Sequence, residues 1–203
     1  DGSRMRQLRA DGVEGAVDFI EGMKLGTVDL SDCRRAVVLG GGNTALDVVR
    51  ELVGLGVPVV KMAYRGTEAG MSGYTHEWDA AKKFGARAVW SVQPIGFIGE
   101  GGKLTGVRCL RLDDKKQPIA GTEHVIPADR AYLAIGQSKL GALVSDLAGI
   151  ETEWGCVVVD ESQATGRPGV YAGGDCANGG KEVVNGAAEG RDAAHAMHAF
   201  LSA

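Results

Sequence analysis

The chain has 203 residues, which suits one large domain or two small ones, and its 44% hydrophobic and 24% charged residues indicate a packed core. The formal net charge of -4 argues against a nucleic-acid-binding surface. No apolar run approaches the roughly 18 residues of a membrane span, and no signal peptide is visible. We therefore expect a cytoplasmic protein that binds neither nucleic acid nor a membrane. Because the sequence begins with Asp1 rather than methionine, we also expect a fragment of a longer protein.

Four cysteines stand far apart in the sequence, at positions 33, 109, 156 and 176. Without a C-x-x-C pair they indicate no iron–sulfur cluster, zinc site or redox dithiol within the chain. His195 and His198 have a spacing that metal ligation would allow, but a solvated helix face explains them better, because Ala194, Met197 and Leu201 mark the expected buried side opposite to them. We predict no metal site, and free thiols in a reducing compartment.

Helices and strands alternate in the first part of the chain. Residues 1–12 are polar and basic and are expected to form a linker, while 13–23 carry apolar residues at helical spacing. The pattern then predicts a strand at 36–40, a helix at 43–53, a strand at 57–64, a helix at 75–84 and a strand at 86–92. This alternation is typical of an α/β fold with a parallel sheet.

The pattern changes after residue 93. Three short extended segments, at 94–98, 104–112 and 123–126, are separated by turn signals that include the charged turn 113–116, so we expect an antiparallel β-meander. The pattern predicts a further strand at 130–135. Beyond it we expect strands at 155–160 and 169–172 and a closing helix at 182–201.

The most informative stretch is 36–45, Ala-Val-Val-Leu-Gly-Gly-Gly-Asn-Thr-Ala, in which a predicted strand runs through a glycine turn into a helix. Gly40, Gly41 and Gly42 allow a sharp turn and a close approach to a ligand, and the helix start offers N–H groups and a positive dipole end. This context predicts a site for the pyrophosphate of a dinucleotide. Asn43 and Thr44 either cap the helix or bond a phosphate, and the sequence leaves both open.

Tyr64 and Arg65 follow the second strand, where a dinucleotide would place its adenosine ribose. NAD-binding proteins usually carry Asp or Glu there, so an arginine favours NADP, whose 2′-phosphate it would bind, over NAD. A solvated surface charge is the alternative interpretation of Arg65.

Further motifs occur in a fixed order, with Tyr-Arg at 64–65, Ala-Ile-Gly-Gln at 134–137 and Pro-Gly-Val-Tyr-Ala-Gly-Gly-Asp at 168–175. Together with the glycine turn, they make the chain resemble the two-dinucleotide-domain flavoprotein oxidoreductases. The nearest likeness is to the glutamate synthase small subunit and to the flavin and NADPH part of dihydropyrimidine dehydrogenase. Residues 178–185 and 188–191 strengthen the second comparison, and the resemblance covers nearly all of the chain.

The resemblance implies an α/β fold in two parts. Residues 34–137 would be a Rossmann-like NAD(P)H-binding domain with a parallel sheet and a β-meander, and 138–203 the C-terminal part of an FAD-binding domain, with 1–33 as a linker and a leading helix. The chain departs from the family in lacking the first half of the FAD domain, with its own G-x-G-x-x-G, and a cysteine-rich iron–sulfur segment. We therefore expect the chain alone to hold FAD poorly and to be inactive by itself.

The resemblance also implies cofactor contacts. The backbone of Ala134, Ile135 and Gly136 would pass close to the nicotinamide. Asp175, which we expect at the end of a strand after Gly174, would bond the ribityl chain of FAD. A helix start made of Lys181, Glu182, Val183 and Val184 would lie near the pyrimidine edge of the flavin and stabilise negative charge there. The alternatives are an ordinary strand-end turn at 134–136 and a glycine-rich loop that only caps a helix.

The implied function is that of a flavoprotein oxidoreductase subunit or fragment that passes hydride from NADPH or NADH to FAD. Electrons would then leave to iron–sulfur clusters or to a partner subunit. Such a transfer needs no acid, base or nucleophile, so we nominate no catalytic residue. The alternative is a non-catalytic NAD(P)-binding module with an incomplete FAD site.

Overall fold

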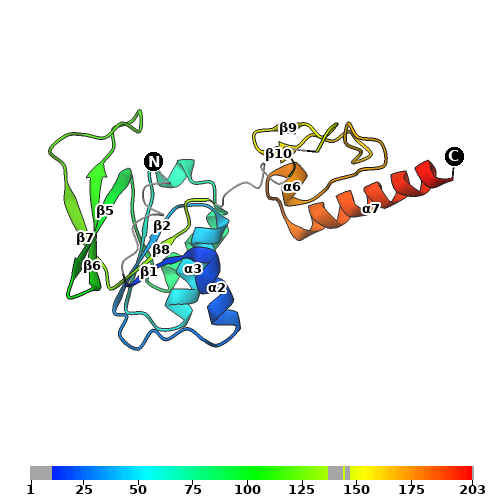
Figure 1. Cartoon of the computed structure of the whole chain (residues 1–203). Coiled ribbons are helices and arrows are strands. Elements are labelled where there is room, and N and C mark those ends of the chain that lie inside the picture. Colours follow the sequence, from blue (N-terminus) through cyan, green and yellow to red (C-terminus); the bar gives the residue numbers. More distant parts are fainter. Residues whose placement is uncertain (1–10, 137–143, 145–146, 203) are drawn as a thin grey trace. The chain divides into compact units, whose positions relative to one another are not determined.

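A computed structural model describes residues 11–136, 144 and 147–202. Residues 1–10 of the predicted linker at 1–12 and Gln137 of the 134–137 motif lie outside the described residues. The chain divides into two compact units, Asp1–Gln137 and Ser138–Ala203. Each unit is described by itself (Figure 1).

A parallel sheet of five strands forms the centre of the first unit. The strands lie in the order β1-β8-β2-β3-β4. Their bounds are β1 Val13–Gly15, β2 Arg35–Leu39, β3 Val59–Ala63, β4 Arg87–Val89 and β8 Arg130–Leu133. Because all neighbouring pairs are parallel, the carboxyl ends of these strands lie at one edge of the sheet.

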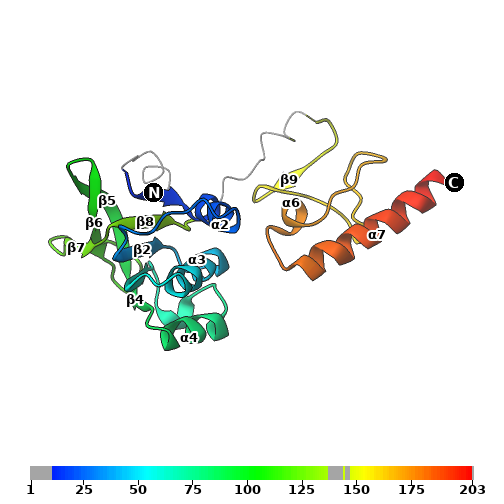
Figure 2. The same ribbon diagram turned by 90° about the horizontal axis from the view of Figure 1, so that it is seen from below.

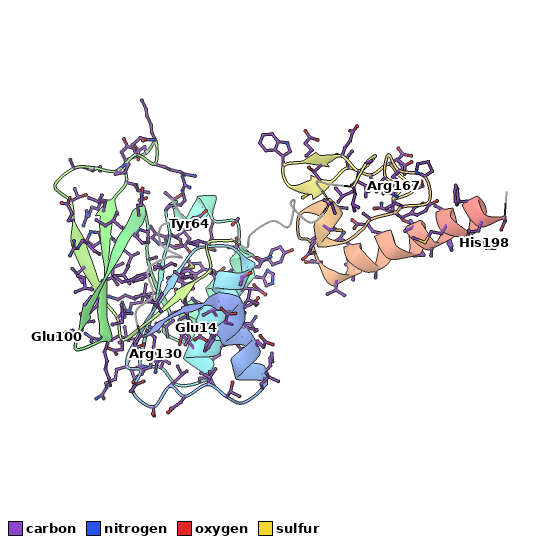
Figure 3. All side chains as sticks on the ribbon, viewed as in Figure 1. Glu14, Tyr64, Glu100, Arg130, Arg167 and His198 are labelled. Carbon is purple, nitrogen blue, oxygen red and sulfur yellow. The ribbon has the colours of Figure 1, made fainter. Side chains whose placement is uncertain are left out.

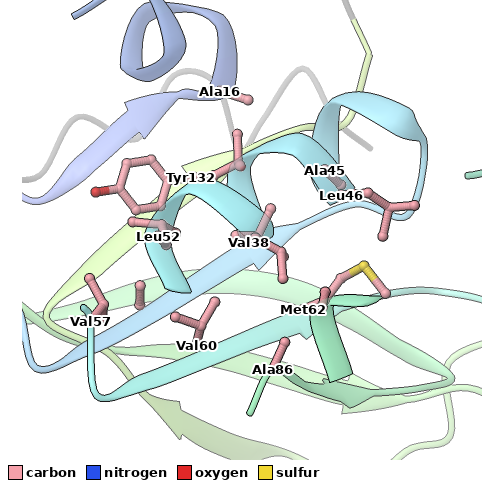
Figure 4. Packing of buried hydrophobic residues seen from close by; sticks show 14 of the residues in the cluster. Ala16, Val38, Ala45, Leu46, Leu52, Val57, Val60, Met62, Ala86 and Tyr132 are labelled. Atoms are coloured by element: carbon pink, nitrogen blue, oxygen red, sulfur yellow. The ribbon is translucent and has the colours of Figure 1, made fainter. Parts of the chain in front are cut away.

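Three helices cover one face of this sheet: α2 Ala16–Lys24, α3 Asn43–Gly54 and α4 Thr75–Lys83 (Figure 2). A short 3-10 helix, η1 Glu68–Gly70, precedes α4. Helix α3 forms because its apolar side chains recur at helical spacing and bury one face, including Ala45, Val48, Val49 and Leu52. They pack against alternate residues of the strands, such as Val38 and Met62 (Figure 4).

The antiparallel meander covers the other face of the sheet. It consists of β5 Val92–Glu100, β6 Lys103–Arg111 and β7 His124–Pro127, hydrogen-bonded in chain order. Val37 and Leu39 of β2 point into this second core, while Ala36 and Val38 point toward the helices. Successive side chains of β2 point to opposite faces of the sheet, and both faces are covered, so all four residues after Arg35 are apolar and buried.

The carboxylate of Asp129, which precedes β8, holds the amino end of β2. It accepts hydrogen bonds from the backbone N–H groups of Arg34 (3.0 Å) and Arg35 (2.8 Å) and from the Arg35 guanidinium, whose Nη2 lies 2.6 Å away. The hydrogen bonds from Arg35 lower the pKa of this carboxyl below its usual value. The start of β2 is thereby fixed to the start of β8.

The described residues of the second unit contain little regular structure before its last helix. Its elements are the hairpin β9 Thr152–Glu153 with β10 Cys156–Val157, the short helix α6 Asp175–Asn178 and the helix α7 Val183–Leu201. No helix in the described part of the chain is both long and apolar enough to cross a membrane.

Three of the predicted elements differ from the structure. The helix expected at 13–23 begins only at Ala16, because the residues before it form β1, which pairs with β8 at the edge of the sheet. The strand expected at 169–172 is an isolated bridge between Ala164 and Tyr171, since Pro168 and the left-handed Gly169 (φ 77°) interrupt it. The strand expected at 155–160 is reduced to two residues.

Candidate dinucleotide-binding site

The glycine turn lies where β2 ends and α3 begins. Gly40 has a φ of 140°, which L side chains rarely adopt, and a Cβ there would overlap the carbonyl oxygen of Ala134 in the segment after β8. A Cβ on Gly41 would lie 2.5 Å from the ring of Tyr64. Both positions therefore require glycine, because the turn runs directly against two neighbouring strand ends.

Backbone N–H groups at this turn are available to a ligand. The N-cap of α3 is Gly42, whose carbonyl accepts from Ala45 (2.9 Å) and Leu46 (3.2 Å). Within the described residues, no hydrogen bond engages the N–H groups of Gly41, Gly42 and the first two helical residues. Unpaired donors at a helix start together with the positive dipole end form an anion site.

The Asn43 side chain does not cap helix α3. Its Oδ1 accepts a hydrogen bond from the backbone N–H of Tyr74 at 3.1 Å. The neighbouring Gly73 donates its N–H to the carbonyl oxygen of Gly41 at 2.9 Å. The capping prediction is wrong for this residue, since the N-cap is Gly42. The Asn43 side chain instead connects the loop before α4 to the glycine turn through its hydrogen bond with Tyr74.

Tyr64 is held by aromatic packing and one hydrogen bond. Its ring meets Trp90 edge to face at 6.2 Å, and Trp90 meets the buried Trp78 in the same way at 5.7 Å. The Tyr64 hydroxyl donates to the carbonyl oxygen of Gly70 at 3.2 Å. Figure 3 shows Tyr64 and Arg130 toward opposite ends of the strands of the first unit. Arg130 begins β8. The ring thus forms a fixed wall beside the glycine turn.

A cavity of about 670 Å³ opens at this edge, and the predicted residues that line it come from three separate segments of the chain. The predicted residues that line it are Gly40, Gly41, Gly42, Thr44, Tyr64, Arg65, Ala134, Ile135 and Gly136. Asn43 is not among the lining residues. Because the segments follow β2, β3 and β8, the cavity lies at the carboxyl ends of adjacent parallel strands, where open α/β sheets bind their ligands.

Two cationic side chains line the cavity. Arg65 is exposed, and among the described residues the side chains of Arg65 and Lys116 form no ion pair or hydrogen bond. Sequence reasoning missed Lys116 because it assigned the turn 113–116 to a charged hairpin. Ser72, Gln93 and Pro94 are further lining residues that no motif indicated.

The second unit places its predicted residues around two helix starts. Asp175 is the first residue of α6, whereas the sequence placed it at the end of a strand. Glu182 is the N-cap of α7 and forms a capping box with Asn185. Gly174, with a φ of 69°, precedes α6, and Lys181, Val183 and Val184 are all exposed.

Glu189 is a residue of this region whose structural role the sequence did not reveal. Its carboxylate accepts from the Gly174 N–H at 2.6 Å and from Nδ2 of Asn178 at 2.9 Å. The hydrogen bond from Asn178, followed by the one from Gly174, lowers the pKa of this carboxyl. A charged residue among the small residues of α7 was the available signal.

The contact face of α7 also differs from the sequence interpretation. Ala193 is buried, while Met197 and Leu201, expected on the buried side, are exposed. The hydroxyl of Tyr171 donates to the carbonyl of Ala196 at 3.4 Å, so the face with Glu189, Ala193 and Ala196 meets the preceding loop. His195 and His198 are exposed, and no group of three metal-ligating side chains occurs among the described residues.

The cysteines in the first unit are buried thiols. Burial raises the pKa of Cys33 and of Cys109 to about 11, so both stay protonated at neutral pH. A protonated, buried thiol is a poor nucleophile, and neither group is suited to redox chemistry.

The family described as pyridine nucleotide-disulphide oxidoreductase matches residues 1–190. The chain belongs to this family. Membership confirms the predicted family resemblance and the predicted α/β fold class.

Individual relatives agree with this membership. The chain is 33% identical over 198 residues to the glutamate synthase [NADPH] small chain of Azospirillum brasilense, covering 92% of this chain and 41% of that protein. It is 34% identical over 206 residues to the NADP(+)-dependent formate dehydrogenase subunit beta of Moorella thermoacetica, covering 93% and 29%. The chain thus spans less than half the length of these two relatives.

A crystal structure of T. acidophilum thioredoxin reductase has the same fold. It aligns with a TM-score of 0.78 and 22% sequence identity, over 95% of this chain and 59% of that one. At this identity the likeness concerns the fold alone.

Proposed function

We propose that the cavity of the first unit binds NADPH or NADH as part of a flavoprotein oxidoreductase. One observation carries the proposal: the unpaired N–H groups at the glycine turn, Arg65 and the 134–136 backbone line one cavity. Its volume of about 670 Å³ suits a small-molecule site. The names of the relatives, which mention NADPH and NADP(+), support the same ligand.

Each segment of the cavity fits one part of the dinucleotide. The N–H groups at 41–44 fit the pyrophosphate, because the missing side chains of Gly40 and Gly41 let backbone approach it. Arg65, after β3, fits the 2′-phosphate of the adenosine ribose. Ala134, Ile135 and Gly136, after β8, fit the nicotinamide end.

The second unit would be the C-terminal part of an FAD-binding domain. Gly174 and Asp175 would face the ribityl chain, with the Gly174 backbone held by Glu189. Lys181, Glu182, Val183 and Val184 would set the positive end of α7 near the flavin, where it would stabilise negative charge. The division at 137/138 follows the two compact units, with 34–137 as the NAD(P)H-binding domain, to whose sheet and core residues 1–33 contribute the edge strand β1 and the helix α2.

When bound, the reduced nicotinamide supplies a hydride and the flavin accepts it. The chain's own groups bind and orient: backbone donors hold the diphosphate, and the glycine-containing backbone at 134–136 permits close approach. No side chain in the cavity has to move a proton, and we propose no catalytic residue. Electrons would leave to an iron–sulfur domain or a partner subunit, and the free thiols fit the reducing cytoplasm.

Calorimetric titration of the purified chain with NADPH and NADH tests the nucleotide part of the proposal. We expect binding of both, with NADPH bound more tightly. Arg65→Ala should weaken NADPH about tenfold while changing NADH less than about twofold, because one charge-assisted hydrogen bond is lost. Arg87→Ala is the matched control, since Arg87 is an exposed arginine of the same unit that begins β4 and does not line the cavity.

Absence of binding by either nucleotide would overturn the proposal. Equal losses for both nucleotides in Arg65→Ala would show that this residue does not bind the 2′-phosphate. A flavin spectrum bleached by NADPH in the purified protein would support hydride transfer. Nucleotide binding without any flavin in the purified protein would instead favour a non-catalytic NAD(P)-binding module.

A further inference from the structure

We propose that Lys116, in the turn between β6 and β7 of the meander, is a second cation that binds the 2′-phosphate. Lys116 and Arg65 together then make the site selective for NADPH. This inference rests on the proposed function and adds a specificity residue to it. Lys116 lines the same cavity as Arg65 although 51 positions separate them in the sequence, and it comes from a different sheet.

Hydrogen bonds place the meander turn beside the ribose end of the cavity. The carbonyl of Gly66, next to Arg65, accepts from the N–H of Ser91 at 3.0 Å. The carbonyl of Ser91 in turn accepts from the N–H of Leu112 at 2.7 Å. Leu112 lines the cavity and forms a bridge with Pro118 at the base of the turn. The turn that carries Lys116 is thus connected to the segment after β3, which is the adenosine side of the site.

The carboxylate of Asp113 fixes the shape of this turn. Its Oδ1 accepts from the N–H groups of Lys115 (2.9 Å) and Gln117 (2.7 Å). The Asp113 carbonyl accepts from the Lys116 N–H at 2.9 Å, and the Asp113 N–H donates to the Gln117 carbonyl, also at 2.9 Å. These hydrogen bonds close the loop, so the backbone that carries Lys116 has a fixed conformation.

The backbone at Lys116 is left-handed, with a φ of 59°. A three-residue hairpin loop ends in such a position, and glycine or asparagine usually occupies it because other L residues are strained there. A lysine at this position therefore makes the folded chain less stable than a glycine would. Strain kept at a position whose side chain lines a cavity points to a function for that side chain.

The charges around Lys116 leave it available to an anionic ligand. The nearest acidic residues in sequence are Asp113, whose Oδ1 accepts two backbone N–H groups, and Asp114. Gly66 stands directly after Arg65, so the segment after β3 offers one cation only. A phosphate monoester carries close to two negative charges at neutral pH, and Lys116 would complement the second one.

Titration of the whole chain with NADP+ and NAD+ tests the inference. Lys116→Gln should weaken NADP+ binding about five- to tenfold and NAD+ binding less than about twofold, because only NADP+ carries the 2′-phosphate. Lys115→Gln is the matched control, since it removes the same charge from the same turn at a residue that does not line the cavity. It should leave both affinities within about twofold.

Lys116→Gly is a second variant, in which the new residue readily adopts the left-handed backbone conformation of position 116. Glycine accepts the left-handed conformation, so this variant should unfold at the same or a higher temperature than the unaltered chain while losing the same NADP+ affinity. Equal behaviour of Lys116→Gln and Lys115→Gln, with normal binding by the unaltered chain, would overturn the inference alone. Failure of the unaltered chain to bind either nucleotide would overturn the proposed function and the inference with it.

Discussion

The two units of this chain are stabilised in different ways. In the first, a parallel sheet separates two hydrophobic cores, and Val37, Val38 and Leu39 are almost fully buried between helices and meander. In the described part of the second, Val157 and Ala193 are the only buried hydrophobic residues. Val183 and Val184, at the start of α7, are 89% and 67% exposed.

Hydrogen bonds take the place of a core in the second unit. Asp160 accepts from Ser162 and Ala164, Thr165 donates to Val170, and Glu189 holds Gly174. Such bonds shape loops, but each contributes only about 1 kcal/mol net. The buried hydrophobic residues of the described chain thus lie almost all in the first unit, and we expect the second unit to have little folding free energy of its own.

Separating the units should give the largest effect. Residues 1–137 expressed alone should unfold cooperatively and bind NADP+ with the affinity of the whole chain, because both cores and the cavity lie within them. Residues 138–203 alone should show no cooperative transition, since so little apolar surface is buried. Thermal unfolding followed by circular dichroism measures both. A sharp melting transition of 138–203 would contradict the comparison.

Gly40→Ala should have the next largest effect, and only in the first unit. The new methyl group would meet the carbonyl of Ala134 at a backbone angle that alanine does not favour, so we expect a loss of about 2 to 4 kcal/mol and of NADP+ binding. Gly54→Ala is the control, because no atom lies within 4 Å of a Cβ there and its helical position favours alanine. Chemical denaturation measures both, and a Gly40→Ala chain as stable as Gly54→Ala would contradict the geometry.

The fold of the first unit could be predicted from the sequence to a large extent. Period-two and helical spacing predicted α3, α4 and the meander, because both periodicities arise from burying one face against a core. In the second unit the same approach failed at 169–172 and at the contact face of α7. Few side chains are buried there, so apolar spacing contains little information about which face makes contact.

The candidate site could be predicted only where the residues that form it are neighbours in the sequence. The glycine turn could be recognised, since a strand, three glycines and a helix are contiguous in sequence. Lys116 could not, because its place in the cavity depends on hydrogen bonds between Gly66, Ser91 and Leu112, which are far apart in the chain. The hydrogen bond between Asn43 and Tyr74 could not be predicted for the same reason, since the two residues are 31 positions apart.

Asp129→Asn should give the smallest of these effects, about 1 kcal/mol of destabilisation of the first unit at neutral pH. The substitution removes the charge that the Arg35 guanidinium and two backbone N–H groups bind, and partial exposure of the pair reduces its contribution. Asp114→Asn, on an exposed turn, controls for the change in net charge. The difference in melting temperature between the variant and the unaltered chain is the measurement.

Acid should abolish this difference. The pKa of Asp129 is lower in the folded state than its ordinary value of 3.8, so the folded state binds its proton less readily than the unfolded state does. The contribution of the carboxylate is therefore complete above about pH 5 and is lost as the pH falls below about 4 toward the lowered folded pKa. The melting temperatures of Asp129→Asn and the unaltered chain should converge over that range. A difference that stays constant down to pH 3 would show that shape, not charge, connects β2 to β8.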